Sequence, residues 1–348
     1  MFIDPHVHFR DGPQSYKETV KHGLHVAERA GMSAVFDMPN PRPALTNYDA
    51  ISRRIELAEA ADSPVWYGFY IGMTSDEKQI EEAIRLYEMF DRAICFKMFA
   101  GHSTENMGII EKPVQRRVYK TLAKNGYKGV LAVHCEKESV MKHGLWDYRN
   151  PISHTFARMP EAEITSVCDE IQLAGETGFE GTLHIAHISV PEAVYLVDEA
   201  RKSMKITCGV TSHHFLLDSS WMMREDGLQY KMNPPLRPRY MVDGMVSCLK
   251  QGKINWIETD HAPHSNDDKL DPMKENPFAS GIVGLPFYPH MVRWLGANGF
   301  SEQQIKDLTF NNIKKAFGKK TSHLQPRQCE PDYNLAGEYP FDPFKDFI

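Results

Sequence analysis

Apolar residues recur along the chain in short runs, and these runs alternate with longer segments in which apolar residues follow a helical period. The short runs are rich in β-branched and aromatic residues, which is typical of buried strands in a parallel sheet. Several longer segments open after Ser, Asn or Pro, which favour a helix start. Strands are predicted over Phe2–Phe9, Ser33–Met38, Val65–Ile71, Ala93–Phe99, Gly129–His134, Gly181–His187, Lys205–Thr211 and Asn255–Asp260. Helices are predicted over Tyr16–Ala30, Tyr48–Ala61, Asp76–Phe90, Pro113–Asn125, Glu161–Thr177, Pro191–Lys202 and Arg239–Lys250. Eight strands with intervening helices predict an α/β protein with a (β/α)8 TIM barrel.

The chain after the eighth strand begins with a long polar loop, His264–Pro277, of a length that is usually functional. Helical patterns return over Leu285–Asn298 and Ser301–Phe317. The remaining residues are rich in Pro, Lys and Gln, with a few aromatic residues near the end. We therefore predict one barrel domain over residues 1–318 and a short irregular tail over residues 319–348 that packs on the barrel.

Composition and charge narrow the class of partner. Hydrophobic residues make up 42% and charged residues 25% of the 348 residues, which suits a folded protein with a large core. The net charge is -6 and the basic residues are scattered, which argues against nucleic acid or an anionic membrane surface and favours a small-molecule substrate. The chain has no stretch near the ~18 uncharged apolar residues of a membrane span and no signal-peptide pattern at its start, so a cytoplasmic location is expected.

Histidines that could bind metal lie at the predicted carboxyl ends of strands, where barrel enzymes place their active sites. His6 and His8 are two residues apart on the first strand, so both imidazoles point to the same side. This spacing alone is a weak signal. The six cysteines are far apart and form no CxxC pair, so neither a disulfide framework nor a thiolate zinc site is indicated.

Lys97 lies in the apolar run AICFKMFAG of the fourth strand, where an unpaired ammonium would be costly. One interpretation is a salt bridge to a buried acid. The other is that burial lowers the pKa of Lys97, which then reacts with CO2 to form a carbamate that bridges two metal ions. We favour the carbamate.

Three later strands supply further candidate ligands. The fifth strand ends at His134, and the sixth offers either His184 or His187, of which His187 lies closer to the strand end. The eighth ends at Asp260, which can bind metal and also move a proton. We predict two Zn2+ ions that share a hydroxide, with His6, His8 and Asp260 on one ion, His134 and His187 on the other, and carbamylated Lys97 between them. Such ligands would also accept Co2+, Mn2+ or Fe2+.

Nine segments, taken in order, resemble the amidohydrolase superfamily and, within it, the dihydroorotase family. They are DPHVHFRDG, DMPNPRPALT, FKMFAG, AVHCE, IAHIS, VTSHHFLL, KMNPPLR, TDHAPH and FASGIVG. The resemblance extends from Asp4 to Gly318. It implies a cyclic amide hydrolase that interconverts N-carbamoyl-L-aspartate and L-dihydroorotate in pyrimidine biosynthesis, with Asp260 as the proton shuttle. It also allows a homodimer.

The resemblance also implies substrate contacts. Arg10, Asn40 and His264 match the positions that clamp the substrate carboxylate, and an Arg fork suits a carboxylate well. Asn233 and the backbone around Gly281 match positions that bind the ring amides. Arg10 as a surface salt bridge and Asn40 as a turn residue are the structural alternatives.

The chain departs from the longer family members because residues for their accessory β-sandwich are absent around the barrel, so we expect a single domain without it. Loop 101–108 could act as a lid, with Ser103 or Thr104 reaching the substrate. Two alternative functions remain open. One is a related cyclic-amide hydrolase, namely a dihydropyrimidinase, hydantoinase or allantoinase, and the other is a catalytically silent structural partner, for example of aspartate transcarbamoylase.

Overall fold

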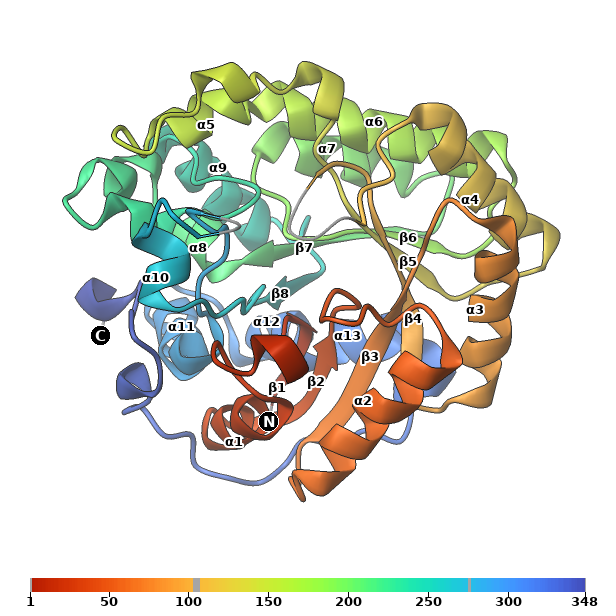
Figure 1. Cartoon of the computed structure of the whole chain (residues 1–348), viewed down its shortest axis with the longest axis horizontal. Helices are drawn as coiled ribbons and strands as arrows, with labels where there is room; N and C mark the ends of the chain where they lie inside the picture. The colour runs from red at the N-terminus through yellow and green to blue at the C-terminus, as the bar shows by residue number, and fades with distance from the viewer. Residues whose placement is uncertain (1, 103–106, 275–276, 348) are drawn as a thin grey trace.

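The strands form a single parallel sheet that closes into a barrel. The computed structural model describes residues 2–102, 107–274 and 277–347. The strands are β1 (Phe2–Val7), β2 (Met32–Asp37), β3 (Trp66–Gly72), β4 (Ala93–Phe99), β5 (Val130–His134), β6 (Thr182–Ile185), β7 (Ile206–Thr211) and β8 (Trp256–Glu258). They pair in the order β1 to β8, and a bridge between Val7 and His261 joins the two ends. Helices surround the strands (Figure 1). The predicted TIM barrel is confirmed.

The helices follow the predicted alternation closely. They are α1 (Val20–Arg29), α2 (Tyr48–Ala60), α3 (Glu77–Met89), α4 (Lys112–Lys124), α5 (Ser153–Ala157), α6 (Pro160–Glu176), α7 (Pro191–Ala200), α8 (Ser212–Leu216), α9 (Arg239–Lys250), α10 (Asn266–Leu270), α11 (Tyr288–Ala297), α12 (Glu302–Lys306) and α13 (Asn312–Ala316). Side chains of Thr19, Asn47 and Asp76 cap α1, α2 and α3 by accepting backbone N–H groups.

Three helix predictions need correction. The helix predicted from Tyr16 begins only at Val20, because the Thr19 side chain caps its first turn. The loop predicted over His264–Pro277 contains α10, which opens with a capping box between Ser265 and Asp268. The pattern over Ser301–Phe317 is divided into α12, a π-helical segment (Asp307–Asn311) and α13.

Alternate strand residues face two separate hydrophobic clusters, because successive side chains of a strand point to opposite sides. Val35 of β2 and Leu131 of β5 belong to the larger cluster, which includes residues of the surrounding helices. Phe36 of β2 belongs to the smaller cluster, whose other members include Ile3, Tyr70, Ile94, Trp256 and Phe317. Apolar side chains thus fill one part of the barrel, and the polar candidates gather at the carboxyl ends of the strands.

The last residues of the chain pack against the barrel. The Phe344 ring stacks on Phe287 with centroids 4.0 Å apart, and Tyr339 lies edge-on to His261 with ring centroids 5.0 Å apart. Arg29 of α1 forms ion pairs with Asp332 and Glu338. No helix in the described part of the chain is long and apolar enough to cross a membrane.

Candidate metal centre and substrate pocket

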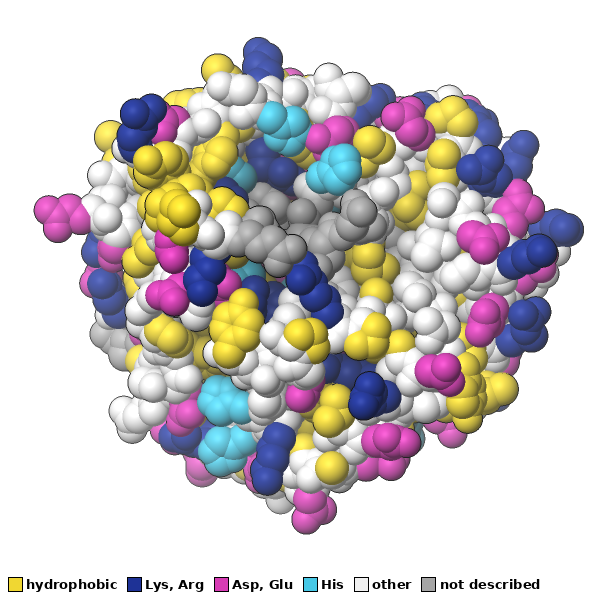
Figure 2. Space-filling model, in the orientation of Figure 1, with side chains coloured by type: hydrophobic (Ala, Val, Ile, Leu, Met, Phe, Trp, Pro, Cys, Tyr) yellow, Lys and Arg dark blue, Asp and Glu magenta, His cyan; other side chains and the backbone are white. Residues whose placement is uncertain are grey.

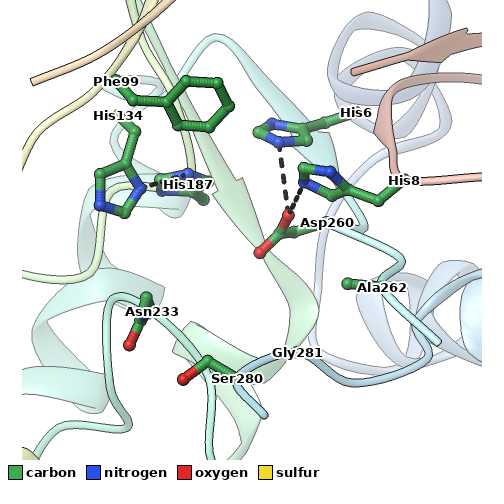
Figure 3. Close-up of a pocket in the computed structure, with 10 residues that line it drawn as sticks. All are labelled: His6, His8, Phe99, His134, His187, Asn233, Asp260, Ala262, Ser280 and Gly281. Carbon is green, nitrogen blue, oxygen red and sulfur yellow. Dashed lines mark hydrogen bonds and ion pairs between the residues drawn. The ribbon is translucent and has the colours of Figure 1, made fainter. Parts of the chain in front are cut away.

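A small pocket opens where the strands end, and histidines of several strands face it (Figure 3). It is lined by His6, His8, Phe99, His134, His187, Asn233, Asp260, Ala262, Ser280 and Gly281. His6 belongs to β1 and His134 to β5, while His8, His187 and Asp260 follow β1, β6 and β8 within two residues. Because the strands are parallel, side chains far apart in sequence meet at this one end of the barrel.

The first donor group consists of His6, His8 and Asp260. Oδ1 of Asp260 lies 2.9 Å from Nε2 of His8 and 3.3 Å from Nε2 of His6. Ligands about 2.0–2.1 Å from a tetrahedral zinc ion stand about 3.3 Å apart, so these spacings suit one shared ion. Among the described residues, these three side chains form a group whose ligand atoms all lie within 4.8 Å of one another, which is close enough to hold one metal ion.

The tautomer of His8 strengthens this interpretation. Its Nδ1 lies 2.7 Å from Oδ1 of Asn40, which can only accept, so Nδ1 carries the proton. Nε2 is then the ring nitrogen that faces the Asp260 carboxylate, at 2.9 Å, and it is the atom that would bind a metal ion shared with that carboxylate. The residues present therefore fit a divalent metal ion.

The second donor group consists of His134 and His187, whose Nδ1 and Nε2 atoms lie 3.1 Å apart. Burial lowers the pKa values of both imidazoles, and the Lys97 ammonium adds to the effect. Both rings are therefore neutral near pH 7, which is the form that binds metal. Nδ1 of His187 has no hydrogen-bond partner among the described residues.

Lys97 lies in β4 with 0% of its surface exposed, and its Nζ has no hydrogen-bond partner among the described residues. Burial lowers its pKa to about 8, although the charges of Glu258 and Asp260 oppose that shift. The salt bridge to a buried acid, one of the two interpretations of this lysine, is therefore not found within the described part of the chain. An ammonium with this pKa is partly deprotonated near neutral pH, and only the free amine reacts with CO2.

Two of the candidate ligands have an unusual backbone conformation. The φ angle is 37° at His187 and 50° at Asp260, in the left-handed region that non-glycine residues seldom adopt. Such conformations cost of order 1–3 kcal/mol each and cluster at functional sites. Here they turn the side chains toward the pocket just after β6 and β8 end.

Glu258, which the sequence reasoning missed, contacts several of these groups. Its carboxylate is buried and accepts hydrogen bonds from the His187 backbone N–H and from Nε1 of Trp256, the latter at 3.1 Å. It also lies 3.5 Å from Nδ1 of His6 and 3.4 Å from Nε2 of His184. A signal was available, because Glu258 precedes Asp260 by two residues and the strand predicted over Asn255–Asp260 would place both side chains on one side.

The alternative histidine of β6, His184, lies away from the metal groups. Its ring stacks on Trp256 with centroids 4.3 Å apart, and its Nε2 faces Glu258. His187 is the residue of this pair that lines the pocket.

Glu136 is a second residue without a predicted role. Its buried carboxylate lies 3.0 Å from Nε2 of His134 and forms an ion pair with Arg158. Carboxylates beside metal-binding imidazoles commonly fix the ring orientation. Glu136 follows His134 by two residues within the AVHCE segment, and this short spacing from a candidate ligand was the signal available in the sequence.

The residues of the predicted carboxylate clamp make several contacts within the protein. Arg10 is 3% exposed, and burial together with the Arg10 charge lowers the pKa of His264. Nε2 of His264 lies 3.1 Å from the Ser280 carbonyl oxygen, and its Nδ1 lies 3.3 Å from Nζ of Lys17. Both nitrogens of His264 are thus engaged within the protein, and Oδ1 of Asn40 is engaged by His8.

The predicted ring-binding residues line the pocket. The Gly281 N–H, however, donates to the Lys231 carbonyl oxygen at 2.9 Å, and its own carbonyl accepts from Nζ of Lys269. That N–H is therefore committed to the protein. Ser103 and Thr104, proposed for a lid over the substrate, lie outside the described residues.

Comparisons with known proteins add independent information. No protein-family model matches the chain. Dihydroorotase from Methanothermobacter thermautotrophicus is 33% identical over 96% of this chain and 73% of that protein. Dihydroorotase from Brevibacillus brevis is 31% identical over 81% of this chain and 64% of that protein. The match to the Brevibacillus enzyme thus spans slightly less than two thirds of its length.

Solved structures agree on the fold. The L-hydantoinase (dihydropyrimidinase) from Arthrobacter aurescens superimposes with a TM-score of 0.80, over 91% of this chain and 70% of that one. Its sequence identity is 20%, so the likeness supports the barrel and no particular substrate. Sequence identity and coverage to the Methanothermobacter relative, together with the nine ordered segments, show that this chain belongs to the dihydroorotase family.

Proposed function

We propose that this chain is a metal-dependent cyclic amide hydrolase that interconverts N-carbamoyl-L-aspartate and L-dihydroorotate. One observation carries the proposal: two groups of nitrogen and carboxylate donors, each at metal-ligand spacing, face one pocket at the mouth of a barrel whose relatives are dihydroorotases. A catalytically silent partner would be expected to have lost ligands, and none of the predicted ligands is missing.

In this proposal the chain holds two divalent ions, with zinc as the expected metal. His6, His8 and Asp260 would hold one ion, His134 and His187 would hold the other, and a carbamate formed on Lys97 would supply an oxygen ligand to both. The buried Lys97 Nζ, for which the described residues supply no hydrogen-bond partner, supports the last assignment. The metal ions supply Lewis acidity toward a carbonyl oxygen and lower the pKa of a coordinated water molecule.

Asp260 is proposed to move the proton. Its Oδ1 faces His6 and His8, while its other carboxylate oxygen points away from both rings (Figure 3). Burial alone would raise the pKa of this carboxyl, but the hydrogen bond with His8 and the charges of His6 and His8 hold it below its usual range. The ionised carboxylate can take a proton from the attacking water and deliver it to the departing ring nitrogen, and ring closure reverses these steps.

Arg10 is proposed to recognise the substrate carboxylate. It follows His8 by two residues and is buried, so a carboxylate beside it would form a desolvated, charge-assisted pair. Hydantoin, dihydrouracil and allantoin lack that carboxylate. The domain boundary at residue 318, a homodimer and a cytoplasmic location stay predictions.

The test is turnover of L-dihydroorotate measured beside hydantoin, dihydrouracil and allantoin, with metal content determined on the same preparation. We expect about two divalent ions per chain and turnover of dihydroorotate well above that of the three other rings. Turnover of a ring without a carboxylate at an equal rate would favour a hydantoinase or allantoinase. Metal-loaded protein with no turnover of any of the four would favour a silent partner.

Carbamylation of Lys97 is tested separately. Removal of CO2 during metal reconstitution should lower the number of ions bound, and Lys97→Ala with added acetate should regain part of it. Full metal loading without CO2 would contradict the carbamate.

A further inference from the structure

A second hollow adjoins the catalytic pocket and shares Asn233 and Ser280 with it. Figure 2 shows Lys or Arg side chains and His side chains gathered around a hollow in this face of the molecule. Helix α5 borders it and contributes His154. We infer that His154 is a positioning residue that fixes the Asn233 amide so that its N–H2 group, and not its oxygen, faces the ligand. The inference rests on the proposed function and adds a specificity determinant to it.

The orientation follows from hydrogen-bond chemistry. Nε2 of His154 lies 3.0 Å from the Met232 carbonyl oxygen and 2.9 Å from Oδ1 of Asn233. A backbone carbonyl can only accept, so Nε2 must carry the proton. The amide atom of Asn233 that shares this N–H must then be the oxygen, because an N–H2 group would place two donors against each other. The amide nitrogen of Asn233 is therefore left to face away from His154.

The surroundings of His154 keep its imidazole neutral, with the proton on Nε2. Burial and the neighbouring cations Lys231 and Arg158 keep the pKa of His154 well below its usual range, although the Met232 carbonyl opposes this shift. Its ring also packs edge-on against Trp146, with centroids 5.3 Å apart. The neutral imidazole has one N–H, and both of its acceptors lie in the Met232–Asn233 segment.

Two further contacts fix α5 against the segment that carries Asn233. The hydroxyl of Thr155 donates to the Leu236 carbonyl oxygen at 3.0 Å, and Nη1 of Arg237 donates to the Arg158 carbonyl oxygen at 2.5 Å. Contacts before and after Asn233 thus restrain the backbone, and His154 restrains the side chain. Preorganisation of this kind reduces the entropy lost when a ligand binds.

The consequence concerns which ligand atom Asn233 recognises. Its amide nitrogen can donate to a carbonyl or carboxylate oxygen but cannot accept from a ring N–H. An acceptor oxygen of the cyclic amide or of the open-chain ureide therefore belongs at this position. A ligand that leaves a polar group of the site without a hydrogen-bond partner binds much more weakly than one that satisfies it. The Asn233 contact should therefore select substrates that have an oxygen at this position.

Two substitutions of Asn233 test the amide orientation. Asn233→Asp has the same shape but presents an acceptor where the amide presents a donor, whereas Asn233→Ala presents nothing. We expect kcat/KM for dihydroorotate to fall about 10- to 100-fold in the Ala variant and further in the Asp variant. A milder loss in Asn233→Asp than in Asn233→Ala would overturn the inference.

A double-mutant cycle tests whether His154 acts through Asn233. We expect His154→Leu to raise KM more than it lowers kcat, and the double variant with Asn233→Ala to be no worse than Asn233→Ala alone within about twofold. His154→Gln retains a donor and should recover most of the activity. His143→Ala, at the rim of the same hollow but with its Nε2 on Glu138, is the matched control.

Metal content and the thermal midpoint are measured for every variant. Multiplicative losses in the double variant, no rescue by His154→Gln, or loss of metal in His154→Leu would each show that His154 has only a structural role. Failure of the proposed function is distinguishable, because it would abolish dihydroorotate turnover in the unaltered protein.

Discussion

Replacement of Glu258 by Gln should weaken metal binding although Glu258 is not itself a proposed ligand. The carboxylate accepts from the His187 backbone on one side and from Trp256 Nε1 on the other, and it lies 3.5 Å from Nδ1 of His6. A Gln amide has one acceptor oxygen in place of two. Its N–H2 group must therefore face either the Trp256 indole or the groups near His6. In either orientation, one buried N–H donor faces another donor and has no acceptor.

The expected size of the effect has two parts. A buried donor without an acceptor costs about 1–3 kcal/mol, so the free energy of unfolding of the metal-free protein should fall by that amount. Loss of a carboxylate that orients metal-binding imidazoles typically costs about 10- to 100-fold in metal affinity. The lack of a side chain at Gly209 makes room for this carboxylate, because a Cβ atom built there would lie 2.7 Å from the Glu258 carboxylate carbon.

The assay is a zinc titration of the metal-free variant against a chromophoric chelator, beside denaturant unfolding of the same sample. Glu170→Gln is the matched control, since Glu170 is equally buried but its partner is Tyr119, whose hydroxyl donates to it at 2.7 Å. We expect the control to keep the affinity of the unaltered protein. Unchanged zinc affinity in folded Glu258→Gln, or an equal loss in the control, would refute the reasoning.

Three further predictions follow from individual contacts. Burial raises the pKa of Glu170 to about 8, well above the usual range of a glutamate, so between these values the folded chain holds a proton that the unfolded chain has released. The free energy of unfolding should therefore fall by a few kcal/mol as pH rises from about 5 to 8, since each pKa unit corresponds to about 1.4 kcal/mol. Urea titrations at three pH values measure this fall, and Glu170→Gln should abolish it. Arg10→Met should lower kcat/KM for dihydroorotate by on the order of 3 kcal/mol with metal content intact, and near-normal turnover would contradict the carboxylate clamp. Tyr339→Phe removes a hydroxyl that lies 3.1 Å from Nε2 of His261 and also donates to Glu18. The free energy of unfolding should therefore fall by about 1–2 kcal/mol. An unchanged urea midpoint would show that this contact of the tail does not contribute to stability.

The barrel and the placement of its polar residues could be predicted because they depend on local patterns. Strand and helix periods are properties of short windows, and parallel strands in a barrel must end at the same face. The candidates His6, His134 and Asp260 therefore had to lie near one another once the strands were recognised. The choice of His187 over His184 needed only their distances from the strand end.

Contacts across the barrel could not be predicted, because they depend on which atoms meet after folding. Nothing in the sequence indicates that Oδ1 of Asn40 accepts from His8, or that the two nitrogens of His264 contact Ser280 and Lys17. Glu258 and Glu136 stand two residues from candidate ligands, but their contacts with His6 and His134 depend on how the side chains pack after folding.

Residue type and spacing were enough to predict the barrel, the family and which strand ends carry histidine and aspartate side chains. The folded structure was needed to show which nitrogen of His8 meets Asn40 and which atom of the Asn233 amide meets His154. A hydrogen bond has a direction, and its direction is fixed by the partner that folding brings within about 3 Å, here from 32 residues away for Asn40 and 79 for His154.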